Sequence, residues 1–490
     1  MSVALAPLFV ACAVVPPHGG TSAQCADTFA RVDAAVAREG VRDAMTTRID
    51  GFPHLRVDRL LASFRDELGN DAALAYWVAQ LARLDAEART VELANLAPAT
   101  RAALALGHAD GVTATLARCR ERMVADELRR PARIAALREA AVVPDDYSLV
   151  LRTLGLYPLT RIPFAAGVRA FERSVAATFA AGADALPMLG ELERYAPPHA
   201  AVPSRDELAR QVRAAAGNPL AIPYLDAAGL EALARAHAPV FEIDAFGDDD
   251  RIGEPYWPAH GPARIDTARA VVFYRQAHTR AGGQVLLQLV YTAWFPARPR
   301  QGHIDLLAGH LDALVWRVTL APDGEPLLYD SMHACGCYHF FFPTPRVRAR
   351  PAPRTLDEWL FVPHELRRPA ERERVVLRVA SRTHYLQAVR FAAAAGTAAR
   401  AYALREADVL RSLAAPGGRR SLFGADGLVA GSERLERFVF WPMGIRSAGA
   451  MRQWGRHATA FVGRRHFDDP LLLDVRFEIL VPALDPAALP

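Results

Sequence analysis

The most informative absence in this sequence is lysine, because all 58 residues counted as lysine or arginine are arginine. Without a lysine amine, the chain has no group that could form a Schiff base with pyridoxal phosphate or a carbonyl substrate. P-loop proteins and protein kinases also require a lysine, so the sequence disfavours nucleotide binding of these kinds. Arginine stays protonated in proteins. Its guanidinium groups can therefore bind anions but are poor general bases.

Long hydrophobic runs and the common catalytic motifs are absent as well. Beyond the N-terminus, no stretch reaches the roughly 18 apolar residues of a membrane-spanning helix. The chain has no HExxH, GxSxG, GxGxxG, CxxC or CxxCH pattern, so zincin proteases, α/β-hydrolases, Rossmann dehydrogenases, thioredoxins and c-type cytochromes lack support. A formal net charge of +4 is small for 490 residues, and composition therefore indicates no nucleic-acid partner.

The N-terminus is apolar from Val3 to Ala11 and then reaches Cys12. This pattern resembles a bacterial lipoprotein signal, in which a small residue precedes the cysteine that receives the lipid. It departs from that signal at Phe9, where leucine is usual, and in having no basic residue before the apolar run. The resemblance implies lipidation of Cys12, a cell-envelope location and the membrane as a partner. The alternative is a short apolar strand or helix in a cytoplasmic protein.

The remaining cysteines suggest one disulfide. If Cys12 carries lipid, four cysteines remain, and four cysteines allow three pairings. Their positions favour a Cys25–Cys119 bridge and leave Cys335 and Cys337 together. The alternative for Cys119 is a buried free thiol, because it lies on an apolar stripe with the helical spacing of a core face.

The first half of the chain indicates a helical domain, residues 13–245, after the N-terminal segment of residues 1–12. Apolar residues recur with the i, i+3, i+4, i+7 spacing of one buried helical face. The clearest of these stripes are Val57–Leu68, Leu74–Leu84 and Phe164–Phe179. The stretch Ser204–Glu207 has the pattern of a capping box and predicts the start of a further helix.

The second half indicates strands. A polar connector broken by glycine and proline, residues 246–264, leads into residues 265–490, where turn signals at Arg280–Gly283 and Ala321–Gly324 separate apolar stretches. The predicted fold class is therefore α+β, with an irregular all-α N-terminal domain and an antiparallel-β-rich α+β C-terminal domain. Ten of the 15 histidines and six of the seven tryptophans lie at or after Trp257, so we expect any ligand site in this half.

The stretch YDSMHACGCYHFFF carries the strongest chemical pattern in the chain. On a strand, His333, Cys335, Cys337 and His339 would share one face, and these ligand types suit Zn or Cu. A straight strand would hold the two histidines roughly 20 Å apart, so one ion could bind all four residues only if Gly336 bends the chain. A His-x-Cys pair could instead share a metal with a distant histidine. The candidates for that partner are His303, His310, His384, His457 and His466.

Three other interpretations of this stretch remain open. Cys335 and Cys337 could form a strained, redox-active disulfide. One of the two cysteines could be a nucleophile with His333 or His339 as its base. The segment could also be purely structural, with its cysteines in the core and its histidines hydrogen-bonded to backbone.

Two further stretches carry weaker signals. Residues 451–470 are rich in arginine and histidine and predict an anion pocket, or half of an acid/base pair, unless the arginines are simply paired with Asp468 and Asp469. The residues of this pocket would be Arg452, Arg456, His457, Arg464 and His466. His303-x-Asp305 and His310-x-Asp312 resemble part of the facial triad of iron oxygenases, which an envelope location disfavours.

Together these patterns predict a bacterial cell-envelope lipoprotein that binds a metal or a small ligand in its C-terminal half. One alternative is a non-catalytic scaffold whose helical half presents a surface to an envelope protein partner. A second alternative is an enzyme that depends on cysteine and histidine or on a metal, and the sequence does not decide whether the protein is an enzyme.

Overall fold

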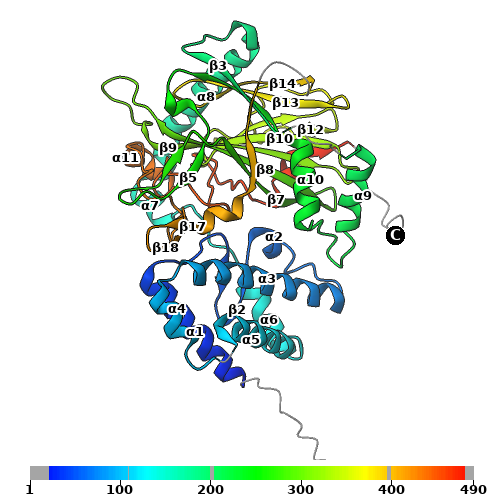
Figure 1. Cartoon of the computed structure of the whole chain (residues 1–490). Coiled ribbons are helices and arrows are strands. Elements are labelled where there is room, and N and C mark those ends of the chain that lie inside the picture. Colours follow the sequence, from blue (N-terminus) through cyan, green and yellow to red (C-terminus); the bar gives the residue numbers. More distant parts are fainter. Residues whose placement is uncertain (1–20, 109, 199–202, 394–398, 481–490) are drawn as a thin grey trace, which may run out of the picture.

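The computed structural model describes residues 21–108, 110–198, 203–393 and 399–480 (Figure 1). Within these ranges the N-terminal part is helical and the C-terminal part is rich in strands, which is the α+β architecture that the sequence predicts. None of the described helices is both long and apolar enough to cross a lipid bilayer. Cys12 lies outside the described residues, and so does the N-terminal pattern that it belongs to.

The helical region covers residues 21–144 and forms the lower part of Figure 1. Its elements are α1 (Ser22–Glu39), β1 (Thr47–Ile49), β2 (Phe52–Val57), α2 (Arg59–Ala62), α3 (Asp71–Asn95), α4 (Pro98–Ala105), α5 (Gly111–Leu128) and α6 (Pro131–Ala140). Trp77 and Leu81 of α3 are fully buried in one core with Leu55 of β2. The stripe Val57–Leu68 is not one helix as expected. It begins at the end of β2, and Asp58 then caps the short α2 by accepting a hydrogen bond from the backbone N–H of Leu61 at 2.8 Å.

A disulfide joins Cys25 on α1 to Cys119 on α5, which is the pairing that the sequence favours. The two Cα atoms are 5.2 Å apart across a sequence separation of 94 residues. Leu116 and Met123, from the same apolar stripe of α5, are buried around the bridge. A cross-link over so long a loop is expected to stabilise the fold mainly by restricting the unfolded chain.

Two sheets share one hydrophobic core in the described part of the strand-rich region. The larger has the order β11-β10-β9-β8-β7-β16 and is antiparallel except at β16, and the smaller, β14-β13-β4-β3-β15, is mixed. Trp316 of the larger sheet and Leu377 of the smaller lie in this core with Leu233 of α10. The strands are β3 (Glu191–Ala196), β4 (Val240–Ala245), β7 (Val271–Ala281), β8 (Gln284–Arg298), β9 (Gly309–Leu320), β10 (Pro326–His333), β11 (Phe340–Pro343), β13 (Glu373–Val379), β14 (Leu386–Ala393), β15 (Arg400–Ala401) and β16 (Ala403–Glu406).

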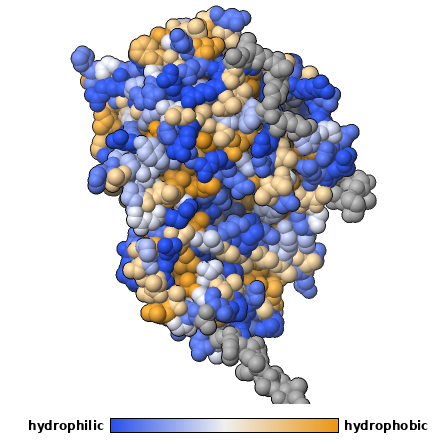
Figure 2. All heavy atoms as spheres, in the orientation of Figure 1, coloured by the Kyte–Doolittle hydropathy of each residue, from blue (hydrophilic) through white to orange (hydrophobic). Residues whose placement is uncertain are grey.

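Helices and short elements surround these sheets. The helices are α7 (Leu149–Leu154), α8 (Tyr157–Ala181), α9 (Arg205–Ala215), α10 (Ala227–His237), α11 (Arg437–Phe440) and α12 (Leu472–Arg476), with 3-10 turns η1 (Ala183–Ala185), η2 (Asp248–Asp250), η3 (Ala407–Arg411) and η4 (Trp441–Met443). The short strands are β5 (Glu254–Tyr256), β6 (Arg264–Asp266), β12 (Val347–Ala349), β17 (Leu413–Ala415), β18 (Gly418–Arg420) and β19 (Phe477–Ile479). On the face shown in Figure 2, hydrophilic and hydrophobic residues are interspersed over both regions.

The strand-rich region begins before the connector expected at residues 246–264. Strand β4 pairs with β13 and with β3, so residues 191–245 are built into the smaller sheet. Helix α8 packs against β14, and its Phe171 lies with its ring centroid 5.1 Å from that of Tyr338. Helical periodicity predicts that one face of a helix is buried. It does not predict which part of the protein covers that face, because the covering segment is distant in the sequence.

Candidate functional site

The HACGCYH stretch forms the turn of a hairpin. Strand β10 ends at His333 and β11 begins at Phe340, with Ser331 opposite Phe340. Gly336 has a φ of +94°, and a Cβ atom at this position would lie 2.4 Å from the carbonyl oxygen of Ala458. Only glycine satisfies both constraints. The chain therefore bends at Gly336, and the assumption of one continuous strand with four side chains on one face is wrong.

The two histidines beside the turn bind different aspartates. His333 Nδ1 lies 3.3 Å from Asp312 Oδ1, and His339 Nε2 donates to Asp330 Oδ2 at 2.8 Å. Burial lowers the pKa of both imidazoles, that of His339 to about 3. Within the described ranges, no group of three or more His, Cys, Asp or Glu side chains is placed to hold a metal ion. Metal binding by Cys335 or Cys337 therefore stays a prediction, and it would need further ligands from outside the hairpin.

Asp312 on β9 is the centre of a buried charge cluster behind the turn. Besides contacting His333, its carboxylate accepts a hydrogen bond from His384 Nδ1 at 2.9 Å and lies 3.2 Å from Arg434 Nη2. Burial acts to raise the pKa of Asp312, but His333 and Arg434 outweigh it and hold that pKa well below its ordinary value. At His384, burial acts to lower the pKa, and the hydrogen bonds to Asp250 and Asp312 raise it overall. Such a charge-balanced cluster is suited to fixing the hairpin in place.

The distant histidines proposed as metal partners are dispersed. His384 reaches this cluster, where its backbone oxygen lies 3.1 Å from His333 Nε2. His457 is buried beside Ala334 of the turn and near Phe467. The other three lie elsewhere: His303 is exposed, His310 is 2.6 Å from the carbonyl oxygen of Ala263, and His466 lies 3.3 Å from Asp145.

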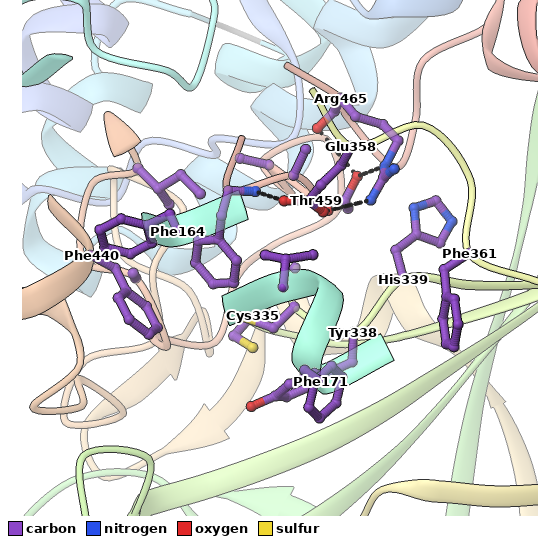
Figure 3. A pocket seen from close by; sticks show the side chains of 18 of the residues that line it. Phe164, Phe171, Cys335, Tyr338, His339, Glu358, Phe361, Phe440, Thr459 and Arg465 are labelled. Atoms are coloured by element: carbon purple, nitrogen blue, oxygen red, sulfur yellow. Dashed lines mark hydrogen bonds and ion pairs between the residues drawn. The ribbon is translucent and has the colours of Figure 1, made fainter. Parts of the chain in front are cut away.

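A cavity of about 440 Å³ lies between α8, the hairpin turn and three loop segments (Figure 3). Phe164 and Phe171 of α8 form one wall, and Phe361, Phe440 and Phe461 contribute others. The remaining lining residues are also mostly aliphatic or aromatic. Pro163 and Gly167 line the cavity and are themselves exposed, so it is open to solvent alongside α8. A largely apolar cavity of this size with a few polar groups is typical of a small-molecule site.

Two free thiols line this cavity. Cys335 and Cys337 are both unpaired and buried, so the Cys335–Cys337 disulfide considered from the sequence is not present. A hydrogen bond between the two thiol groups lowers the pKa of Cys335 and raises that of Cys337 well above its ordinary value. Cys335 is therefore the thiol of the pair that more readily forms a thiolate.

Three carboxyl groups that line the cavity have raised pKa values, and at Glu358 the cause is burial, against the opposing attraction of Arg465. Burial raises the pKa of Glu436 to about 7, against the opposing attraction of Arg434. Burial also raises the pKa of Glu172 to about 7, and the nearby Glu358 adds to this effect. Near neutral pH, Glu436 and Glu172 are thus present partly as neutral acids. Neutral carboxyl groups can donate a hydrogen bond to a ligand oxygen, which carboxylates cannot do.

Tyrosines separate the cavity from the Asp312 cluster. The hydroxyl of Tyr385 donates to that of Tyr338 at 2.9 Å, and Arg298 Nη2 donates to the Tyr385 hydroxyl at 3.2 Å. The ring of His333 lies behind them, with its centroid 5.0 Å from that of Tyr338. The charge cluster therefore supports the floor of the cavity, and its histidines are one layer away from any occupant.

Of the residues predicted to form an anion pocket, Arg456, Arg464 and His466 gather around Asp145 and Asp146, whereas Arg452 and His457 are buried. Arg452 is buried and donates through Nε to the backbone oxygen of Cys335 at 3.1 Å, which helps to hold the turn. The exposed side of the stretch pairs with carboxylates from the loop before α7 rather than with Asp468 and Asp469. These contacts are Arg464 to Asp145 at 2.9 Å, Arg456 to Asp146 at 3.3 Å and His466 to both aspartates. With two carboxylates already among them, these cations offer little attraction for a further anion.

Sequence reasoning missed most of the cavity. The spacing of Phe164 and Phe171 predicts only a buried helical face, and the signal that marks a cavity there is Glu172, an acid directly beside that face. Glu436 carried no local signal at all, because its unusual pKa arises from burial by segments distant in the sequence.

The chain was also compared with known proteins. No protein-family model, no curated protein and no solved structure matches it.

Proposed function

We propose that this protein binds an apolar or weakly polar small molecule in the cavity between α8 and the β10–β11 hairpin. The observation that carries the proposal is the cavity itself, about 440 Å³ of space with mainly aliphatic and aromatic walls. Burying apolar ligand surface against such walls would supply most of the binding free energy.

The polar groups of the cavity define what the ligand should carry. Glu172 and Glu436, with pKa values of about 7, can donate hydrogen bonds to a carbonyl or hydroxyl oxygen. A ligand carboxylate would be disfavoured beside these acids once they ionise. The expected ligand is therefore an uncharged molecule with a long or multi-ring apolar body and one or two oxygen atoms.

A neutral fluorescent probe tests the proposal directly. N-phenyl-1-naphthylamine is expected to increase its fluorescence on binding to the full chain. Gly167→Trp should abolish this binding, because Gly167 lines the cavity and a side chain there meets no atom within 4 Å of its Cβ. The matched control is Gly167→Ala, which adds one methyl group at the same helical position and should bind the probe normally. Unchanged binding in Gly167→Trp would contradict the proposal.

Cys335 and Cys337 provide a second, independent readout. In a Cys12→Ser variant they are the free thiols of the chain, because Cys25 and Cys119 are paired. Saturating probe should slow their reaction with an apolar maleimide several-fold. Equal rates with and without the probe would place its binding site elsewhere.

Soft-metal binding by the same two thiols is the second candidate function, favoured by the hydrogen bond between them. Two thiolates can hold Cu(I), which prefers sulfur ligands. Anaerobic titration should then give one equivalent of Cu(I) that is lost in Cys335→Ser. Less than about 0.2 equivalent retained after dialysis would reject this candidate.

The cell-envelope location rests on the N-terminal sequence alone. Labelling with a radioactive fatty acid should mark the full-length product and fail for Cys12→Ser.

A further inference from the structure

An apolar ridge covers one edge of the strand-rich region. It is formed by large apolar side chains of α7, of the start of α8 and of the α11–η4 segment, each between 37 % and 70 % exposed. Its members are Leu149, Val150, Leu154, Leu156, Leu159, Ile162, Phe438, Val439 and Trp441. We propose that this apolar ridge docks the protein on the surface of a lipid bilayer that contains anionic lipids.

The three segments of the ridge form one surface. The backbone N–H of Ser148, just before α7, donates to the carbonyl oxygen of Gly444 at 2.8 Å, directly after η4. A Cβ atom at Gly155, between α7 and α8, would lie 2.5 Å from the Cβ atom of Pro442. In Figure 1, α7 and α11 lie on the same side of the strand-rich region.

Helix α7 buries a charged side chain and exposes apolar ones, the reverse of an ordinary surface helix. Its one buried residue is Arg152, whose Nε donates to the backbone oxygen of Met443 at 2.9 Å while its guanidinium lies 4.2 Å from the ring centroid of Tyr157. Leu149, Val150 and Leu154 point outward instead. A helix on the surface of a water-soluble protein usually buries its leucines and exposes its arginines. The outward leucines of α7 therefore indicate an apolar medium or partner on this side.

The charge of the ridge favours a bilayer over another protein surface. Between Tyr147 and Phe171, and again between Arg437 and Arg456, every charged residue is arginine. Four of them, Arg161, Arg169, Arg437 and Arg446, are exposed or partly exposed beside the apolar side chains. Protruding leucine and aromatic side chains surrounded by cations are the combination that binds an anionic lipid surface. Three of these arginines have an acid nearby: Asp357 lies 3.6 Å from Arg161, Asp426 lies 3.8 Å from Arg446, and Arg169 is close enough to Glu172 to act on its pKa. The acids offset part of the positive charge, and Arg437 adds a further cation at the ridge.

The ridge is continuous with the cavity. Ile162 belongs to the ridge, and the next two residues, Pro163 and Phe164, line the cavity. Val439 belongs to the ridge, and the adjacent Phe440 lines the cavity from the other side. Docking would thus bring the wall of the cavity to the bilayer, and the ligand would be an amphiphile taken from that bilayer. This last step rests on the proposed function, whereas the docking itself does not.

Vesicle flotation tests the docking. The full chain with Cys12→Ser, which cannot carry the lipid, is expected to float with vesicles of phosphatidylcholine and phosphatidylglycerol. Binding should be weaker to phosphatidylcholine alone and should fall with added salt, because the arginines contribute by charge. Failure to float with either vesicle would overturn the inference.

Paired variants locate the contact. Adding Leu154→Glu and Leu159→Glu should reduce the partition coefficient at least about tenfold, since each change replaces an apolar side chain that the bilayer would bury with an anion that anionic lipids repel. The matched control is Leu106→Glu, which changes a leucine that is 76 % exposed at the end of α4 in the helical region. Equal losses in the control and in the ridge variant would also overturn the inference.

Two further measurements separate this inference from its alternatives. The ridge variant should still bind the neutral probe, because neither leucine lines the cavity, and this also shows that the variant is folded. Loss of vesicle binding with probe binding intact supports the ridge as the docking surface. Sedimentation velocity addresses the other occupant: a dimer that dissociates in the ridge variant, together with no vesicle binding, would make the ridge an interface between copies and reject the bilayer.

Discussion

The unusual pKa of Glu436 makes a quantitative prediction about stability. Burial raises this pKa to about 7 from an ordinary value of 4.5. One pKa unit corresponds to ~1.4 kcal/mol, so ionising Glu436 in the folded chain costs about 3 kcal/mol more than in the unfolded chain. The folded state holds more protons between these two pKa values, and the free energy of unfolding therefore falls as the pH rises from about 4.5 to about 7 and levels off above it.

The substitution Glu436→Gln isolates this contribution. Glutamine has the shape of the protonated acid and cannot ionise, so the variant and the wild type should have nearly equal stability at about pH 5. At about pH 8 the variant should be more stable. Between pH 5 and pH 8, the free energy of unfolding of the variant minus that of the wild type should grow by about 2–3 kcal/mol. Other groups titrate in both proteins and cancel in this comparison.

Urea denaturation followed by tryptophan fluorescence is the appropriate assay. Six of the seven tryptophans lie at or after Trp257, so the signal reports mainly on the strand-rich region that contains Glu436. The same pH series with the neutral probe should show weaker binding above pH 7 in the wild type and much less dependence on pH in the variant. Parallel stability curves for the two proteins would refute the assignment of a buried, largely neutral Glu436.

Three further substitutions test other parts of the structure. Cys25→Ser should destabilise the helical region by about 2–4 kcal/mol in urea, because the bridge to Cys119 closes a long loop, and a loss below about 1 kcal/mol would contradict this. Asp312→Asn leaves the buried Arg434 without its carboxylate and should cost about 3–5 kcal/mol by the same assay, whereas a loss below about 1 kcal/mol would show that the cluster does not hold the hairpin. Gly449→Ala places a Cβ atom 2.0 Å from Glu436 Oε1 at a φ of +85° and should lower the thermal midpoint markedly, while Gly167→Ala, which meets no atom within 4 Å, should not. Equal midpoints for these two alanine variants would contradict both the close contact with Glu436 and the backbone strain at Gly449.

Local patterns predicted several elements well. The stripe Phe164–Phe179 lies in α8, the turn Arg280–Gly283 joins β7 to β8 with Ala281 opposite Gln284, and Ala321–Gly324 lies between β9 and β10. Each of these depends on residues that are close in the sequence, such as a 3.6-residue period or a pair of glycines in a tight turn. Local sequence does not distinguish a strand from a turn at HACGCYH, because a turn can carry the same residues as a strand. The close approach of Ala458 to Gly336, which requires the bend, is a tertiary contact.

The sequence by itself determined the fold class and the absence of lysine chemistry, because composition and periodicity are properties of the chain alone. It favoured the Cys25–Cys119 pairing, and the tertiary structure decided it by bringing α1 and α5 together. Only the tertiary structure decided that α8 belongs with the strands, that Asp312 gathers His333, His384 and Arg434, and that a cavity lies above the thiols. It also decided that the leucines of α7 face outward while Arg152 is buried. These features depend on which distant segments exclude water from which side chains, and no local pattern in the chain encodes that.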